Sequence, residues 1–352
     1  MDTGNERSSG YPIVKLNMND RWQARGAIVA ARRHATGLWV VTMFVVSVSA
    51  AACGARYITS EPIDVALRAW PPDSISRNVV VVSVDGLRPD AIEMYAAPTL
   101  QRLMREGSYT LSARTIDPST TLPSHTSMLT GLPPERHGVL WNNVATADAD
   151  SIDMPNIFSL ARAKGYSTAA FFSKAKFQPL QLHGTLDYSQ APGGWFGRWS
   201  SERTVADVAQ YLNDARPNVL FVHLTDPDAA GHRAGWMTAD YGRAILVADG
   251  AVSRLLDLAD DAYGAGNYSV IVTADHGGHG TGHGTDDPRD VTIPWIAWGQ
   301  GVRQGALGPA VEVHTMDTAA TVLWLLGLQQ PTDWAGEAVV QAYQASTVVA
   351  TD

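Results

Sequence analysis

The stretch NVVVVSVDG, residues 78–86, decides the fold of this 352-residue chain. Its continuous β-branched run is too apolar for a strand with one face in solvent, so it predicts a central strand of a parallel sheet. Similar apolar runs recur at residues 167–173, 218–225, 268–275 and 293–299. Helical patterns alternate with them, at residues 98–106, 156–164, 202–215, 238–262 and 316–328. This alternation predicts an α/β fold in which helices sandwich a mostly parallel central sheet.

Composition divides the chain into four parts. We expect a leader over residues 1–53, a linker over 54–76, one folded domain over 77–330 and a C-terminal tail over 331–352. With 45% hydrophobic and 17% charged residues, the chain has the composition of an ordinary folded globular protein.

The leader carries the features of an export signal at residues 37–53. Arg32 and Arg33 precede an apolar run of about 15 residues, which is short for a membrane span. Small residues then precede Cys53, the one cysteine of the chain, as in a bacterial lipoprotein cleavage site. We therefore expect a protein exported to the cell envelope, anchored by lipid or by an uncleaved segment and facing the periplasm or the outside. A core helix is the third interpretation of this run.

Charge limits the partners of the folded part. The formal net charge is −9, and the first 52 residues hold six Lys/Arg and three Asp/Glu, which leaves 20 basic and 32 acidic residues, or −12, for the rest. A body this acidic repels nucleic-acid duplexes. An anionic substrate would need bound cations to attract it.

Polar residues follow several of the predicted strands. Asp85 lies in SVDG, residues 83–86. Residues 224–232 read LTDPDAAGH, and residues 273–284 read TADHGGHGTGHG. The segment STTLPSHTSMLTGLPPERHGV, residues 119–139, follows a further strand-like segment and is too rich in hydroxyls, histidine and proline for a core. Because chemistry collects at the carboxyl ends of strands in such sheets, we expect these segments to meet at one rim.

The rim residues have the pattern of a metal site. Without thiols, carboxylate oxygen and imidazole nitrogen are the ligands of zinc or a similar divalent ion. Asp228 and His232 are four residues apart, which places them on one side of a helical turn. Adjacent acidic and imidazole side chains follow at 275 and 276, and His279 or His283 can return to the site from a glycine-rich loop. The pattern predicts two metal ions.

In the order in which they follow one another along the chain, the four segments resemble the alkaline phosphatase superfamily, and within it the type I phosphodiesterase and nucleotide pyrophosphatase branch. The resemblance covers residues 78–328. It implies an alkaline phosphatase-like fold with a single catalytic domain. It also implies a metal-dependent hydrolase of phosphodiesters or nucleotide pyrophosphates. The expected cofactors are two divalent ions, with zinc preferred and manganese or mixed occupancy as alternatives, and the expected partner is a small phosphoester.

The resemblance assigns roles to individual residues. Thr121 matches the nucleophile, and Asn142, 21 residues later, matches a donor to a phosphoryl oxygen, with Asn143 as its alternate. Ser124 departs from the asparagine that nucleotide pyrophosphatases usually have there. The matched ligands of the metal that holds the nucleophile are Asp85, Asp275 and His276, and those of the second metal are Asp228, His232 and His283, with His279 as the alternate.

These roles imply a mechanism. A threonine hydroxyl is a poor nucleophile near neutral pH, and His125 is the one candidate base in its segment, so metal coordination is expected to activate Thr121. A covalent phosphothreonine would form and then be attacked by water at the second metal. Asn142 and the backbone amide after Thr121 would stabilise the developing charge, helped by the N-terminus of a helix. Sulfatases of this fold need cysteine or serine at the nucleophile position, so sulfate-ester hydrolysis is not expected.

Two features bear on the substrate. Lys174 and Lys176 resemble the substrate clamps of some monoesterases and phosphonoacetate hydrolases, which makes a phosphomonoesterase or phosphonate hydrolase the alternative function; both lysines could equally be solvated. A group of aromatic residues could stack on a nucleobase or serve only in packing, namely Trp141, Trp195, Phe196 and Trp199. A non-catalytic metal-binding surface lipoprotein is a third interpretation, which a missing nucleophile or a broken ligand set would favour.

Overall fold

The computed structural model describes residues 74–143, 154–181, 185–194 and 197–344. The leader and the linker up to residue 73 lie outside the described residues, so export and membrane attachment through residues 37–53 stay predictions. Among the described residues, no helix combines the length and apolar character needed to cross a membrane.

One mixed sheet of eight strands forms the centre of the described part, in the order β4-β3-β5-β1-β6-β7-β2-β8. The prediction of an α/β fold with helices on both sides of a mostly parallel sheet is confirmed. β7 runs antiparallel to both of its neighbours, β6 and β2, while the other pairs are parallel. The strands are β1 (Val79–Val84), β2 (Ser108–Arg114), β3 (Thr168–Phe171), β4 (Tyr188–Gln190), β5 (Val219–Leu224), β6 (Ser269–Thr273), β7 (Thr292–Gly299) and β8 (Gly305–Ala306).

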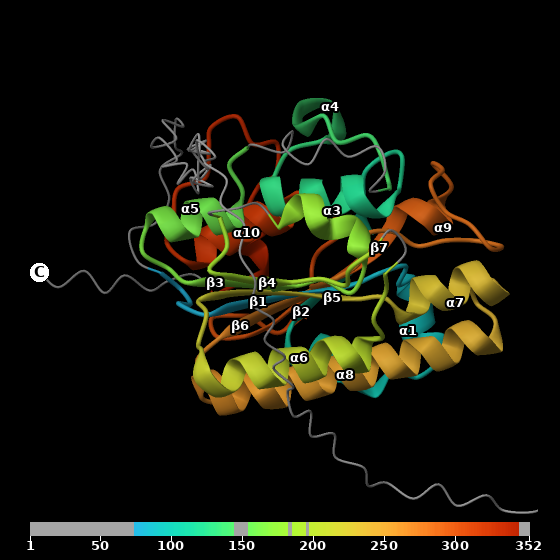
Figure 1. Cartoon of the computed structure of the whole chain (residues 1–352), viewed down its shortest axis with the longest axis horizontal. Coiled ribbons are helices and arrows are strands. Elements are labelled where there is room, and N and C mark those ends of the chain that lie inside the picture. Colours follow the sequence, from blue (N-terminus) through green and yellow to red (C-terminus); the bar gives the residue numbers. More distant parts are fainter. Residues whose placement is uncertain (1–73, 144–153, 182–184, 195–196, 345–352) are drawn as a thin grey trace, which may run out of the picture. The chain divides into compact units, whose positions relative to one another are not determined.

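Helices cover both faces of the sheet, with α3, α5 and α10 on one side and α6 and α8 on the other (Figure 1). The α-helices are α1 (Pro89–Met94), α2 (Pro98–Glu106), α3 (Thr121–Thr130), α4 (Pro134–His137), α5 (Ile157–Ala163), α6 (Ser201–Asp214), α7 (Asp226–Ala234), α8 (Ala239–Tyr263), α9 (Pro288–Val291) and α10 (Asp317–Leu325). The short 3-10 helices are η3 (Ala175–Leu180) and η4 (Val340–Ala342).

The register of the central strands brings the polar turns together. All six residues of β1 and all six of β5 are buried, as expected for strands covered on both faces. Val84 pairs with Leu224, and Ser83 pairs with Thr273, so β1, β5 and β6 end side by side. The turns that follow them carry Asp85, α7 and Asp275, which places three acid-bearing segments at one edge of the sheet.

Helix α3 contradicts the expectation that residues 119–139 are too polar for a core. All ten residues of α3 are buried, because its hydroxyls find partners inside the helix or beside it. Thr126 Oγ1 donates to Leu122 O at 2.8 Å, and Thr130 Oγ1 donates to Thr126 O at 2.7 Å. The helix can therefore run through the interior and present its first turn to the sheet edge.

The fold also extends past the predicted boundary at residue 330. Trp334 is 2% exposed and packs against Gly131, and Tyr343 is 4% exposed and packs against Trp324. Residues 331–344 therefore belong to the folded body, because their aromatic rings complete the core beside α3 and α10.

One buried carboxylate fixes the start of α2, and its removal should destabilise the fold. Asp249, on α8, accepts hydrogen bonds from Thr99 N at 3.0 Å and Leu100 N at 2.8 Å while 2% exposed. We expect Asp249→Ala to lower the free energy of unfolding by about 2 kcal/mol, since two buried amides lose their acceptor. Urea denaturation measures this. Asp261→Ala, an exposed change on the same helix, is the control, and equal stability of the two variants would contradict the assignment.

Candidate active site

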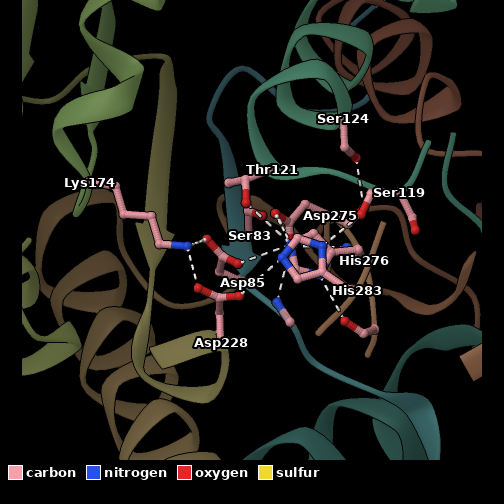
Figure 2. A network of polar contacts seen from close by, with 12 residues as sticks. Ser83, Asp85, Ser119, Thr121, Ser124, Lys174, Asp228, Asp275, His276 and His283 are labelled. Carbon is pink, nitrogen blue, oxygen red and sulfur yellow. Dashed lines mark hydrogen bonds and ion pairs between the residues drawn. The ribbon is translucent and has the colours of Figure 1, made fainter. Parts of the chain in front are cut away.

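Three buried carboxylates stand at the carboxyl ends of the central strands. Asp85, Asp228 and Asp275 are each at most 2% exposed, and Figure 2 shows them facing one another. Asp275 Oδ1 accepts from Gly86 N at 3.1 Å, and Asp228 N donates to Asp85 O at 3.0 Å, so backbone contacts set their spacing. Gly86 has φ +73° and lies so close to Asp228 that a Cβ would sit 3.0 Å from its Cα, which explains the glycine.

The two oxygens of these carboxylates have different surroundings. Asp85 Oδ2 and Asp228 Oδ2 lie 2.5 Å and 2.6 Å from Lys174 Nζ. Asp85 Oδ1, Asp228 Oδ1 and Asp275 Oδ2 are buried without a hydrogen-bond partner among the described residues. A buried carboxylate oxygen without a partner is costly. These three oxygens fit a bound cation.

Burial and charge act in opposite directions on these carboxyls. Burial by itself raises the pKa of Asp85, but Lys174 and His223 hold it well below its usual range. Burial and the neighbouring Asp85 charge raise the pKa of Asp275 well above its usual range. The site thus holds more negative charge than Lys174 can balance, which again fits divalent cations.

Three imidazoles present the same nitrogen to the carboxylates. Each donates Nδ1–H to a backbone carbonyl: His276 to Gly277 O at 2.8 Å, His283 to Ser119 O at 2.8 Å and His232 to Thr281 O at 3.0 Å. This fixes the tautomer and leaves Nε2 free to bind a metal. His276 Nε2 lies 3.2 Å from Asp275 Oδ2, and His232 Nε2 lies 3.2 Å from Asp228 Oδ1.

Two groups of possible metal ligands result. Asp228, His232 and His283 form one, and Asp85, Asp228 and His276 form the other; within each group the ligand atoms lie within 4.8 Å of one another. The donor set of oxygen and nitrogen suits zinc or another divalent ion. The alternate candidate His279 instead places its Nδ1 2.7 Å from Asp290 Oδ1. The geometry therefore favours His283 over His279.

Thr121, the predicted nucleophile, begins α3, and the side chain of Asn142 contacts the same turn. Thr121 is 1% exposed, and its Oγ1 lies 3.3 Å from Nε2 of His276, which belongs to the ligand group with Asp85 and Asp228. Asn142 Oδ1 accepts from Leu122 N at 2.9 Å. In this structure the amide after Thr121 thus binds Asn142, and its expected role toward a phosphoryl group stays a prediction.

The two lysines, paired in the sequence, point to different places. Lys174 binds Asp85 and Asp228, two predicted metal ligands, which differs from its predicted role as a substrate clamp. Lys176 Nζ donates to Asn142 Oδ1 at 3.2 Å, on the side of the predicted phosphoryl donor. Burial and the nearby Lys174 charge lower the pKa of Lys176 to about 8.

Two further buried histidines hold residues of the site by hydrogen bonds. His223, which the sequence motifs do not reveal because it lies within an apolar strand, donates Nε2–H to Asp85 Oδ2 at 2.8 Å and accepts from Ser173 Oγ at 2.6 Å. His125 donates Nδ1–H to Thr121 O and accepts from Ser83 Oγ, each at 2.8 Å. Burial lowers the pKa of both, so each acts as a neutral imidazole with a fixed tautomer.

Ser124, at which the sequence departs from the asparagine usual in nucleotide pyrophosphatases, contacts the backbone of Asp275. Ser124 Oγ donates to Asp275 O at 2.8 Å and lies 2.8 Å from Thr115 Oγ1, which binds the same carbonyl (Figure 2 shows Ser124). The short hydroxyl thus holds the backbone of a predicted metal ligand.

The aromatic residues are placed only in part. Trp195 and Phe196 lie outside the described residues. Trp199 lies under the Arg203 guanidinium at 5.5 Å, and Trp141 is partly buried against the core. Their predicted role in stacking on a substrate stays a prediction.

A mixed α/β sheet with carboxylates and imidazoles at its strand ends, and a threonine at a helix start beside them, defines the class as an alkaline phosphatase-like protein. A model of the type I phosphodiesterase / nucleotide pyrophosphatase family matches residues 79–287, more than half of the chain. The chain belongs to that family.

Curated relatives agree with this assignment. The chain is 26% identical over 214 residues to ectonucleotide pyrophosphatase/phosphodiesterase family member 1 of Homo sapiens, covering 56% of this chain and 23% of that protein. It is 26% identical over 241 residues to bis(5'-adenosyl)-triphosphatase ENPP4 of Homo sapiens, covering 60% of this chain and 49% of that protein. The matched region thus spans at most about half the length of these relatives.

Solved structures share the fold. Murine ectonucleotide pyrophosphatase / phosphodiesterase 5 superposes with a TM-score of 0.63 at 17% identity, over 76% of this chain and 100% of that one. The alkaline phosphatase PafA superposes with a TM-score of 0.59 at 13% identity, over 79% of this chain and 100% of that one.

The position of Lys176 predicts an unusual titration. In the metal-free protein its ammonium should lose a proton as the pH rises through about 8, because burial and the Lys174 charge disfavour the charged form. NMR of protein labelled with [13Cε]lysine measures this on a chain with four lysines. Lys176→Arg should remove the titrating signal, and Lys164→Arg, an exposed change, should leave it. A midpoint above 10 would contradict the placement of Lys176.

Proposed function

We propose that this protein is a metal-dependent phosphoric ester hydrolase that acts on phosphodiesters or nucleotide pyrophosphates through Thr121. The observation that carries the proposal is the position of Thr121 Oγ1, buried at the start of α3 and 3.3 Å from His276 Nε2. Family membership supports it. One relative is named as a bis(5'-adenosyl)-triphosphatase, and an inactive threonine-to-alanine variant of murine ectonucleotide pyrophosphatase / phosphodiesterase 5 was solved in complex with AMP.

Two divalent ions, preferably zinc, would complete the site. Asp85, Asp275 and His276 would hold one together with Thr121 Oγ1, and Asp228, His232 and His283 would hold the other. The support is the set of buried oxygens without a hydrogen-bond partner, which includes Asp275 Oδ2, and the two groups of possible ligands, in which Asp228 rather than Asp275 joins Asp85 and His276. When bound, such ions lower the pKa of a coordinated hydroxyl and neutralise phosphoryl oxygens.

The residues of the chain supply the nucleophile and its environment. Thr121 Oγ1 would lose its hydroxyl proton to water and attack phosphorus, so that the Oγ1–P bond forms as the bond to the leaving oxygen breaks and that oxygen takes a proton from water. Water would then hydrolyse the phosphothreonine and restore the hydroxyl. The Asn142 side chain is held by Leu122 N through its Oδ1, which leaves its amide N–H groups to donate to the phosphoryl group. The N-terminus of α3 adds partial positive charge.

A phosphomonoesterase or phosphonate hydrolase is the second candidate, and one contact favours it. Lys176 Nζ lies 3.2 Å from Asn142 Oδ1, beside the proposed phosphoryl donor. A cation there would favour the dianion of a monoester or phosphonate over the single charge of a diester. Lys174 contributes less to this argument, because it already binds Asp85 and Asp228.

Removing the nucleophile tests the proposed mechanism. Thr121→Ala should lower kcat by about a thousandfold or more, because the variant lacks the hydroxyl that forms the proposed covalent intermediate. Metal content, measured by mass spectrometry, should stay close to that of the wild type, since the carboxylates and imidazoles are retained. Thr121→Ser keeps the hydroxyl and is the matched control with partial activity. Full turnover in Thr121→Ala would remove Thr121 from the mechanism.

Substrate preference separates the two candidates. For the zinc-loaded protein we expect kcat/KM to be at least about tenfold higher on bis-p-nitrophenyl phosphate than on p-nitrophenyl phosphate. Lys176→Met should reduce the monoester reaction more than the diester reaction, and Lys164→Met should change neither. A preference for the monoester that Lys176→Met abolishes would decide for the second candidate.

A further inference from the structure

Trp236, to which the sequence motifs assign no role, lies against the ligand group of Asp228, His232 and His283. It is 5% exposed and sits between the end of α7 and the start of α8. Its backbone N–H donates to Gly280 O at 2.8 Å, which ties this connection to the glycine-rich loop after β6. The loop carries Thr281 and His283, so the position of Trp236 bears directly on the imidazoles.

The indole ring touches both imidazoles of that group. Its centroid lies 5.3 Å from the His232 ring at an interplanar angle of 84°, and 5.9 Å from the His283 ring at 63°. Two glycines make room for it. A Cβ would lie 2.6 Å from the ring at Gly231 and 2.2 Å at Gly278, so a larger residue at either place would displace the indole.

The indole nitrogen fixes the orientation of the ring. Nε1–H donates to Gly86 O at 3.0 Å, and the same carbonyl accepts from Tyr241 OH at 2.8 Å. Gly86 follows Asp85 directly, and its N–H donates to Asp275 Oδ1. The Nε1–H bond to the Gly86 carbonyl therefore anchors the ring that meets the His232 and His283 imidazoles.

His232 depends most on such support. Its side chain is 47% exposed, and Nδ1 binds Thr281 O, while the indole packs beside a ring that also contacts Asp228 Oδ1 and the His283 imidazole. Holding an exposed side chain in one rotamer costs conformational entropy. A ring that already packs against the side chain lowers the entropy lost when a ligand binds.

We propose that Trp236 is a positioning residue that holds His232 and His283 with their Nε2 atoms toward Asp228 Oδ1. The proposal rests on the proposed metal site. Groups that orient metal ligands typically change metal affinity by about 10–100-fold. Since Trp236 touches one ligand group, its loss should weaken one of two zinc equivalents and spare the other. Its fluorescence should also change when that equivalent binds.

Zinc titration of the metal-free full chain tests this, with a chromophoric chelator as competitor and tryptophan emission as a second signal. Trp236→Phe keeps an aromatic ring and removes the Nε1–H donor. We expect about 10–100-fold weaker binding of one zinc equivalent, an unchanged second equivalent and loss of the zinc-dependent emission change. Trp298→Phe is the matched control, because Trp298 pairs with Val270 toward the opposite end of β6, and it should leave all three readouts unchanged.

The outcomes separate this inference from the proposed function. Two zinc equivalents bound by Trp236→Phe with wild-type affinity would overturn the role of Trp236 and leave the metal site intact. Failure of the wild type to bind zinc would overturn the metal site itself.

Circular dichroism checks that the metal-free variant is folded. If it is not, the same titration is run on Gly278→Ala, which crowds the ring without removing it. Selective loss of one equivalent in that variant would support the role of Trp236, and two equivalents of wild-type affinity would overturn it.

Discussion

The structure depends on burying three carboxylates, Asp85, Asp228 and Asp275, within one site at the edge of a sheet. Like charges in a medium of low dielectric constant repel strongly, and burial raises the free energy of each ionised form. The parallel register of β1, β5 and β6 makes this closeness unavoidable, since it ends the three strands together. Lys174 offsets part of this charge, and the buried oxygens without a hydrogen-bond partner suit a bound metal ion.

In the carboxylates and imidazoles of the site, the two polar atoms of one side chain have different partners. Lys174 and His223 bind Oδ2 of Asp85, while Oδ1 faces His276. In the imidazoles, Nδ1 binds a backbone carbonyl and Nε2 faces the carboxylates. Each group is thus oriented before any ion binds, which limits the conformational entropy lost on binding. The buried first turn of α3 brings Thr121 to the same place, because hydrogen bonds within the helix satisfy its hydroxyls.

Much of this was accessible from the sequence. The β-branched run at 78–86 predicts β1, and the acid-bearing segments after the strands predict which residues meet at the edge. Other features depend on three-dimensional partners that composition cannot show. α3 looks too polar for a core until its internal hydrogen bonds are seen, and Lys174 and Lys176 look equivalent although the backbone turning into η3 sends them apart. His223 is hidden in an apolar strand, and the contact of Trp236 with His283 joins residues that are far apart in the sequence.

The central claim is that the carboxylates and imidazoles hold two metal ions, one of them on the nucleophile. Anomalous X-ray scattering at the zinc absorption edge, from crystals of the zinc-loaded protein, tests it most directly. We expect two peaks. One should lie about 2.0–2.2 Å from oxygens of Asp85, Asp275 and Thr121, and the other at similar distances from Asp228, His232 and His283. A single peak away from Thr121 Oγ1, or no peak within the two ligand groups, would contradict the claim.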